Sequence, residues 1–345
     1  MKITTVGIDL AKNVFQVHGV DERGKAVLKK QLKRHQVLVY FSNMPPCLIG
    51  MEACGGAHYF ARRLQAQGHT VRLMAPQFVK PYVKSNKNDA ADAEAICEAV
   101  GRPNMRFVPI KNVEQQAALS LHRARQGFIR ERTALANRIR GLLAEFGLII
   151  PQGIHYIARR MPEILEDADN ELSDAMRALL ARLHDHLQEL NRQAQELEAQ
   201  IIAWHRRSEL SRKLEAVPGI GPLTASALVA TVGDAKNFKN GRQMAAWLGL
   251  VPKQDSSGGK TVLRGISKRG DVYLRTLLIH GARAVLCAAQ RRKATAGQWV
   301  QDLLERRNAN VVAVAMANKT ARIVWALLAK ARQYDPQHVS TPVTA

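Results

Sequence analysis

Four acidic residues in the first hundred positions combine the residue type and the placement needed to bind a metal ion. Asp9 ends the apolar run VGID, and Glu52 ends the apolar run LIGME. A carboxylate at the end of a buried strand is costly unless that strand end faces a polar site. Asp89 and Asp92 are three residues apart at the start of an expected helix, so their side chains project from one face. These carboxylates form an oxygen-rich set that suits Mg²⁺.

The helical pair has a simpler explanation as well. Acidic residues in the first turn of a helix complement the helix dipole and need no ligand. The basic residues nearby favour metal binding instead, because Lys84 and Lys87 precede the two aspartates in a strongly basic chain. Two bound ions could position a phosphodiester and stabilise its attacking and leaving oxygens, while the two lysines help to hold the nucleic-acid backbone.

A second set of residues could supply nucleophilic chemistry. Ser256 and Ser257 precede two glycines in a polar turn, and five cations follow within a short span: Lys260, Arg264, Lys268, Arg269 and Arg275. A serine hydroxyl in such a field could attack a phosphodiester and hold it as a covalent ester, which would conserve the bond energy without ATP. Taken alone, the same turn would be an ordinary surface loop.

A glycine-containing hairpin indicates a contact to nucleic-acid backbone. The segment VPGIGPLTASAL at 217–228 has Gly219 and Gly221 ahead of a helical pattern. Glycines let backbone amides approach a phosphate, and a following helix N-terminus adds a favourable dipole. This is the helix-hairpin-helix pattern, which contacts the DNA backbone without reading sequence. The alternative is a tight turn between two helices that binds nothing.

The charge of the whole chain points to a polyanionic partner. Its 345 residues include 51 Lys and Arg against 29 Asp and Glu, which gives a formal net charge of +22. Such an excess favours nucleic acid first and an anionic membrane second. We expect no membrane association, because no apolar run approaches about 18 residues and no signal-peptide pattern opens the chain. A cytoplasmic protein with scattered, reduced cysteines is expected.

The elements that must position these residues form an α/β region followed by an all-α region. Over the first hundred residues, strand patterns alternate with helical ones, beginning with a hairpin made by TTVGIDLA and NVFQVHGVD. A helix is expected from Asp89, with Asn88 as its N-cap. After Val113 the strand patterns stop, and the helix that follows carries many arginines, among them Arg123 and Arg130.

These patterns divide the chain into five parts. They are an α/β domain, a basic helix, a helical or coiled-coil connector, a mostly helical domain with the hairpin and the serine, and a disordered tail: residues 1–112, 113–150, 151–212, 213–333 and 334–345. In the connector, apolar residues recur every three or four positions from Leu172 to Trp204. That stripe would either face a second subunit or pack on its own chain.

The acidic segments also resemble a known family. In order and spacing, GIDLAKNVFQVHGVD, MEACGG and KNDAADAEAI look like the DEDD tetrad of a RuvC-like, ribonuclease-H-type domain. They are most similar to transposases of the insertion-sequence family called "one-ten", in its "eleven-eleven" branch, which are relatives of the Piv DNA invertase. The resemblance places the tetrad at Asp9, Glu52, Asp89 and Asp92.

The C-terminal part resembles the transposase domain of the same family. There the nucleophile is a serine before glycine, followed downstream by K-x-G-[DN]-x-x-L-R, which stands here at 268–275. The match places the nucleophile at Ser257, and Ser256 remains a neighbouring alternative.

The resemblance implies a Mg²⁺-dependent serine recombinase that moves its own element. It also implies donor and target DNA as substrates, a structured non-coding RNA of the element as guide, and a homodimer or homotetramer. Carboxylates and serine would meet in one composite site, with contributions from different subunits. Backbone contacts from the basic helix would suit base pairing as the source of sequence choice.

Two other functions compete with this one. A RuvC-like junction nuclease would use water as nucleophile and leave the serine loop with a structural role. A non-catalytic nucleic-acid-binding protein would use its acidic residues only to cap helices, and salt would weaken its binding by counterion release.

Overall fold

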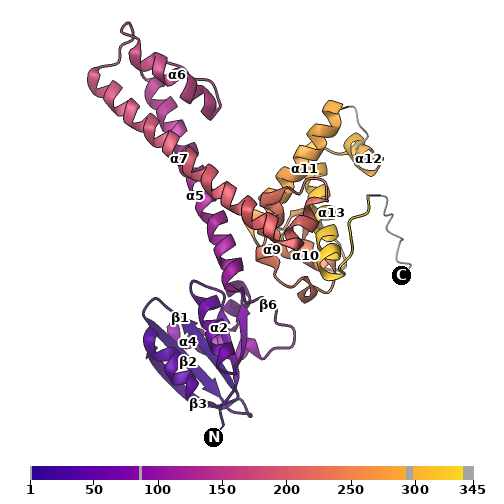
Figure 1. Cartoon of the computed structure of the whole chain (residues 1–345). Helices are drawn as coiled ribbons and strands as arrows, with labels where there is room; N and C mark the ends of the chain where they lie inside the picture. The colour runs from indigo at the N-terminus through magenta and orange to yellow at the C-terminus, as the bar shows by residue number, and fades with distance from the viewer. Residues whose placement is uncertain (1, 85–87, 293–297, 337–345) are drawn as a thin grey trace. The chain divides into compact units, whose positions relative to one another are not determined.

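The computed structural model describes residues 2–84, 88–292 and 298–336. The chain forms two compact units, Met1–Val113 and Glu114–Ala345, which are described separately (Figure 1). The first unit is α/β, and the second is mostly helical with one small hairpin. Both results confirm the expected fold class at this level. The five-part division of the chain stays a prediction, and residues 337–345 of its expected tail lie outside the described residues.

A six-stranded sheet forms the centre of the first unit, in the order β3-β2-β1-β4-β5-β6. Its strands are β1 Thr5–Leu10, β2 Val14–Val20, β3 Ala26–Lys33, β4 Leu48–Glu52, β5 Thr70–Met74 and β6 Phe107–Val108. The expected β1–β2 hairpin is confirmed as an antiparallel pair, and β3 extends it as an antiparallel third strand. Strands β1, β4 and β5 run parallel, so the carboxyl ends of β1 and β4 share one edge.

Helices cover both faces of this sheet (Figure 1). On one face, Ile8, Phe15 and their neighbours pack against α1 (Val37–Ser42) and α2 (Ala57–Ala66) in one core. On the other face lies α4 (Asp89–Val100), reached through α3 (Pro76–Val79) and a short 3₁₀ turn. Because successive strand residues point to opposite faces, the residues between those of the first core point toward α4.

Three helices open the second unit: α5 (Val113–Ala144), α6 (Ile154–Glu166) and α7 (Asp174–Arg207). Leu180, Leu187 and Leu190 of α7 are buried in a core made with α6 and the second half of α5. The apolar stripe of the connector is therefore largely buried against its own chain, which is one of the two arrangements expected for it. A seam with a second subunit is not needed to account for that stripe.

The rest of the second unit packs six further helices around one core. They are α8 Glu209–Glu215, α9 Pro222–Val232, α10 Gly241–Trp247, α11 Val272–Arg292, α12 Gln298–Arg306 and α13 Ala309–Ala329. Between α10 and α11 in the sequence lies a hairpin made by β7 (Pro252–Gln254) and β8 (Leu263–Ile266). By length and composition, α11 and α13 could span a membrane. Both contribute to this core, as interior helices of a folded domain do.

Candidate metal centre and serine hairpin

Two glycines allow α4 to lie directly on the sheet. Gly7 of β1 and Gly50 of β4 are register partners, and both face α4. A Cβ on Gly7 would collide with the backbone of α4 at Ala93 and Cys97, and one on Gly50 would lie 2.7 Å from Cβ of Val100. Close helix–sheet contact therefore depends on these glycines. Asp9 stands two residues beyond Gly7 on the same face, so α4 also brings its first turn toward that carboxylate.

The first turn of α4 is held in a defined conformation by its cap. Asn88 accepts a hydrogen bond from the backbone N–H of Ala91 at 2.8 Å, as its sequence position predicted. Asp89 and Asp92 both lie in that turn, and carboxylate oxygens of Asp9, Asp89 and Asp92 lie within 4.8 Å of one another. Three carboxylates so close would repel one another without a cation, and their oxygens are the donors that hard divalent ions prefer. The donor set fits a divalent metal ion.

Glu52 lies at the same edge of the sheet but outside that close trio. It follows Met51, whose register partner on β1 is Ile8, so Glu52 and Asp9 end neighbouring parallel strands. Their nearness to one another is also reflected at Cys54. Desolvation is the main cause that raises the pKa of this thiol, and the charges of Glu52 and Asp9 raise it further. Glu52, the predicted fourth carboxylate, therefore lies near Asp9 but is not part of the group of three whose oxygens lie within 4.8 Å of one another.

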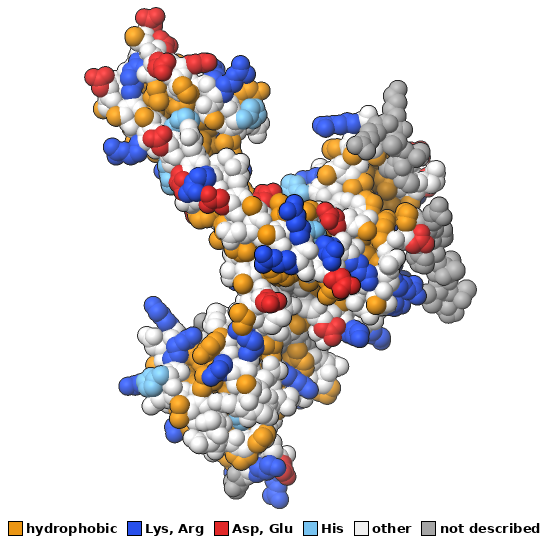
Figure 2. Space-filling model, viewed as in Figure 1, with side chains coloured by type: hydrophobic (Ala, Val, Ile, Leu, Met, Phe, Trp, Pro, Cys, Tyr) orange, Lys and Arg blue, Asp and Glu red, His pale blue; other side chains and the backbone are white. Residues whose placement is uncertain are grey.

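The basic residues expected beside this centre are only partly described. Lys84 is exposed and pairs with Glu98 at 3.2 Å and Glu94 at 3.6 Å, two carboxylates of α4. The hydrogen bond that Lys84 donates to Glu98 is the main cause that raises the pKa of Lys84. Lys87 lies outside the described residues. Lysine and arginine side chains also predominate on the face of the first unit visible in Figure 2.

In the second unit, Ser257 lies at the tip of the β7–β8 hairpin. It forms an isolated bridge with Lys260, whose backbone N–H donates to the carbonyl of Ser257 at 3.0 Å. Gly258 and Gly259 between them have φ of +54° and +75°. A two-residue hairpin turn with both central residues at positive φ favours glycine at both positions. A Cβ at either glycine would meet open space, so conformation and not packing selects them.

The two serines have different surroundings. Ser256 Oγ accepts a hydrogen bond from the backbone N–H of Val262 at 3.2 Å and another from Nε2 of Gln254 at 2.9 Å. Ser256 is exposed, but these contacts tie its hydroxyl to the hairpin. Ser257 is exposed, and within the described ranges no protein group hydrogen-bonds to its hydroxyl. Of the two serines, Ser257 is the one whose hydroxyl is not engaged by a described residue.

The cations near the hairpin separate into exposed and buried groups. Lys260, Lys268 and Arg269 are exposed, and Arg264 is exposed beside Asp255, with 2.6 Å between Nε and Oδ2. Arg275 differs, because only 8% of it is exposed. Its Nη1 donates at 3.1 Å both to the carbonyl of Leu248 and to that of Arg269. The expectation that Arg275 faces a phosphate therefore needs correction: its guanidinium fastens the loop before α11 to the end of α10.

Packing explains one glycine of the expected helix-hairpin-helix. Gly219 has φ of +85°, and a Cβ there would lie 2.8 Å from the carbonyl oxygen of Gly281 on α11. Gly221 is the N-cap of α9, and a Cβ there would meet nothing within 4 Å. The tight contact to α11 accounts for Gly219 without any ligand. The open surroundings of Gly221 leave room for a phosphate at this turn.

The arginines of α5 also separate into two groups. Arg123 and Arg130, the two expected to face nucleic acid, are exposed. Arg125 instead pairs with Glu198 of α7 at 2.6 Å, and Arg132 donates to Asn191 at 2.7 Å. The arginine-rich pattern of this helix thus combines an outward charged surface with internal fastening of α5 to α7.

A buried polar group centred on His122 was not predicted from the sequence. Its Nδ1 lies 3.0 Å from the Tyr273 hydroxyl, and its Nε2 lies 3.0 Å from Ser226 Oγ. Ser226 donates to the carbonyl of Pro222, so it can accept from Nε2 of a neutral imidazole. Burial lowers the pKa of His122 to about 4, with a further contribution from Arg125. A lone histidine on the apolar side of α5 was the only available signal.

Two protein-family models match the chain. The model described as "Transposase IS116/IS110/IS902 family" covers residues 211–296, which include the serine hairpin. A transposase model of the IS110 type with a DEDD motif covers residues 6–147, which include all four acidic residues. The two candidate centres therefore fall in separately matched regions.

Relatives similar over nearly the whole chain are named as transposases. One is "Probable family 20 transposase" of Pseudomonas aeruginosa, 55% identical over 97% of this chain and 100% of the relative. Another is "Transposase for insertion sequence element IS1328" of Yersinia enterocolitica, 44% identical over 94% of this chain and 96% of the relative. A third is "Transposase for insertion sequence element IS1111A" of Coxiella burnetii, 43% identical over 96% of this chain and 91% of the relative.

Proposed function

Since this chain belongs to the IS116/IS110/IS902 family of insertion-sequence transposases, we propose that it cuts and rejoins DNA with a metal-binding carboxylate centre and a serine nucleophile. The observation that carries the first half is the convergence of Asp9, Asp89 and Asp92 within 4.8 Å. The second half is supported by the exposed hydroxyl of Ser257 within the other matched region.

The residues proposed to hold Mg²⁺ are Asp9, Asp89 and Asp92, with Glu52 at the rim. When bound, the ion would supply positive charge to the oxygens of a scissile phosphate. The protein's own part is to keep these carboxylates fixed in place. The strand ends fix Asp9 and Glu52, and the capped first turn of α4 fixes the two aspartates. Such rigid placement reduces the rearrangement needed when the phosphate arrives.

Ser257 is proposed to attack the scissile phosphodiester. Its Oγ loses a proton and forms a bond to phosphorus, while the bond from phosphorus to the leaving sugar oxygen breaks and that oxygen takes up a proton. One phosphodiester is exchanged for another, so no external energy source is required. Reversal of this step with a different sugar hydroxyl joins the new strands and regenerates the serine. The exposed cations Lys260, Arg264, Lys268 and Arg269 would attract the phosphate backbone.

The guide RNA and the oligomeric state belong to this proposal as well. A structured RNA of the element would engage the exposed Arg123 and Arg130 by backbone contacts, with the turn at Gly221 as another contact to phosphate. A homodimer or homotetramer would bring together the centres of different copies. Kinship with the Piv DNA invertase is part of the same proposal.

The experiment that tests the proposal traps the covalent ester. Incubating the full chain with its element's RNA, supercoiled donor and target DNA and Mg²⁺ should yield protein attached to DNA after denaturation. Ser257→Ala should abolish the adduct, while Ser256→Ala should retain it because its hydroxyl serves the hairpin. An adduct that survives Ser257→Ala refutes the proposed nucleophile. Cleaved DNA with free ends and no attached protein would favour the junction nuclease.

A further inference from the structure

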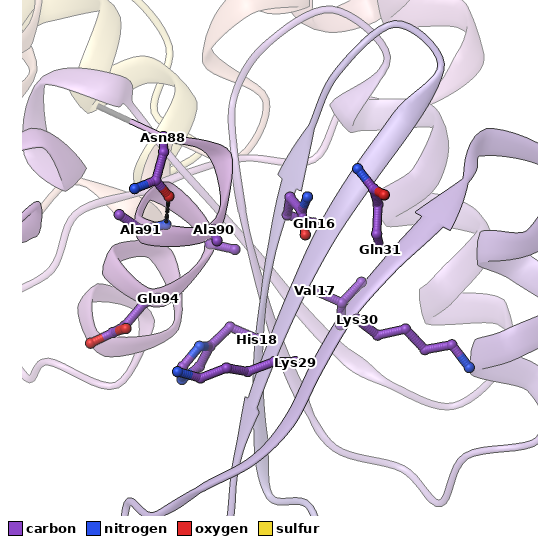
Figure 3. Close-up of a pocket in the computed structure, with 11 residues that line it drawn as sticks. Gln16, Val17, His18, Lys29, Lys30, Gln31, Asn88, Ala90, Ala91 and Glu94 are labelled. Atoms are coloured by element: carbon purple, nitrogen blue, oxygen red, sulfur yellow. Dashed lines mark hydrogen bonds between the residues drawn. The ribbon is translucent and has the colours of Figure 1, made fainter. Parts of the chain in front are cut away.

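A cleft opens on the sheet beside the metal centre, between α4 and the β2–β3 hairpin (Figure 3). Its volume is about 430 Å³. Gln16 and His18 of β2 are register partners of Gln31 and Lys29 of β3, so these four side chains share one face. Ala90, Ala91 and Glu94 of α4, together with its N-cap Asn88, form the opposite wall. The alanine side chains of this wall are short, so they leave the cleft open to a ligand.

The floor carries polar groups that the protein itself does not use. His18 is only 6% exposed and lines the cleft, yet no described residue hydrogen-bonds to its ring nitrogens. Its ring nitrogens are not among the buried, unpartnered side-chain atoms of the described residues, so they reach the open cleft and are available to a ligand. The carboxamides of Gln16 and Gln31 likewise have no hydrogen-bond partner among the described residues.

Two lysines line the cleft, Lys29 and Lys30, but only Lys29 can offer its ammonium group there. Lys30 contributes its stem, because its Nζ lies 4.7 Å from the ring centre of Tyr40 on the other face of the sheet. Lys29 remains, lying beside His18 in Figure 3 with Glu94 across from them. A single ammonium group, an imidazole and several carboxamides make a site for hydrogen bonding more than for bulk charge. That chemistry suits the edge of a nucleobase, because a carboxamide offers a donor and an acceptor side by side.

The cleft adjoins the carboxylates. Gln16 is the register partner of Asp9, and Asn88 immediately precedes Asp89. A strand whose phosphate lies at the metal centre would therefore have a neighbouring nucleotide within reach of the cleft. A base that is stacked and paired in a duplex cannot enter a cleft, so a nucleotide bound there must be unpaired.

From this arrangement we propose that the cleft between α4 and the β2–β3 hairpin binds one unpaired nucleotide of a nucleic-acid strand held at the metal centre. Gln16, Gln31 and His18 hydrogen-bond to the base edge, and Lys29 contacts an adjoining phosphate. The proposal rests on the proposed function, since it takes the carboxylates as the place where the strand is held. It adds a positioning site that would fix which nucleotide lies next to the scissile phosphate.

A binding experiment without catalysis tests this site. The full chain is titrated, with Ca²⁺ in place of Mg²⁺, with short single-stranded DNA and RNA of one sequence, each intact or with one abasic position moved along the strand. In the wild type, one abasic position should weaken binding about tenfold, the effect of losing a good base contact. In Gln16→Ala, and again in Gln31→Ala, that position should no longer matter. Gln65→Ala, on α2 at the opposite face of the sheet, should bind like the wild type.

The outcomes separate this proposal from the reaction mechanism. Loss of the abasic effect in the cleft variants supports the site, and the strand type that shows it identifies DNA or RNA as the source. An abasic effect that is absent, or equal in wild type and Gln16→Ala, overturns it. So does a common loss of affinity in Gln16→Ala and Gln65→Ala. Because only binding is measured, these results stand whether or not Ser257 forms an adduct.

Discussion

The two candidate centres of this transposase are built in opposite ways. The carboxylate centre depends on residues 80 positions apart in the chain, joined by strand register and by the contact of α4 with Gly7 and Gly50. The serine lies at the tip of a hairpin whose turn is made by the two residues that follow it. Long-range packing thus positions the carboxylates, while local turn chemistry exposes a hydroxyl. Substitutions at the packing glycines should therefore disturb the carboxylates by destabilising the first unit, whereas substitutions in the turn should affect only the serine hairpin.

The largest expected effect comes from the carboxylates. Asp9→Asn keeps the shape of the side chain but removes a charge from the trio, so strand cleavage should fall by about a thousandfold or more. Cleavage assays with the element's DNA check this, and circular dichroism should show an unchanged fold. Glu22→Gln, a change of an exposed carboxylate in the same unit, is the matched control. Equal cleavage by Asp9→Asn and by the control would mean that Asp9 has no part in the reaction.

Two glycine substitutions compare the centres directly. Gly7→Ala puts a Cβ against the backbone of α4 and should destabilise the first unit by about 3 kcal/mol. Gly258→Ala meets open space and should cost only about 1 kcal/mol, from its positive φ.

Hydrogen exchange on α4 and tryptophan fluorescence follow the two units separately, since all four tryptophans lie in the second. Gly7→Ala should speed exchange in α4 and leave the fluorescence transition unchanged. Equal stability of Gly7→Ala and wild type would show that α4 does not need the close contact.

The buried His122 makes the second unit sensitive to acid. Its pKa is about 4 in the folded chain against 6.5 for an ordinary histidine. Unfolded chains therefore bind the proton first as pH falls, and stability should decrease between these two values, by about 3 kcal/mol in total. Denaturant titrations followed by tryptophan fluorescence would measure this. His122→Asn should lose most of that pH dependence, and an unaltered slope in the variant would assign it to other groups.

The smallest contrast concerns two arginines near the hairpin. Arg275→Met leaves the carbonyls of Leu248 and Arg269 without their donor and should destabilise the second unit by about 2 kcal/mol. Arg264→Met removes an exposed ion pair and should cost less than about 1 kcal/mol. Binding to DNA should show the reverse order, with the larger loss in Arg264→Met once both variants are folded. Similar unfolding midpoints for the two variants would contradict the buried role of Arg275.

Much of the first unit follows from local patterns in the sequence. Alternating apolar residues predicted the β1–β2 hairpin, and Asn88 predicted the start of α4. Edge strand β3 was missed, because its exposed lysines hide the alternation that marks a half-buried strand. The cleft next to the metal centre was missed with it, since one wall of the cleft belongs to β3.

The limits of prediction in the second unit have a different cause. Lys268 and Arg275 belong to one cation-rich motif in the sequence, but in the folded chain Arg275 is buried and Lys268 is exposed. Likewise the apolar stripe of α7 could not show whether its partner was α5 or a second copy. Contacts between distant segments decide both questions, and no local pattern records them.

The central claim is that Asp9, Asp89 and Asp92 form a divalent-metal centre, and locating a bound ion tests it most directly. Crystals of the full chain grown with Mn²⁺ in place of Mg²⁺ would reveal the ion by its anomalous scattering. The account predicts a peak within coordinating distance of these three carboxylates, and its loss in Asp9→Asn. A peak elsewhere in the protein with none at this trio, or one that persists unchanged in Asp9→Asn, would contradict it.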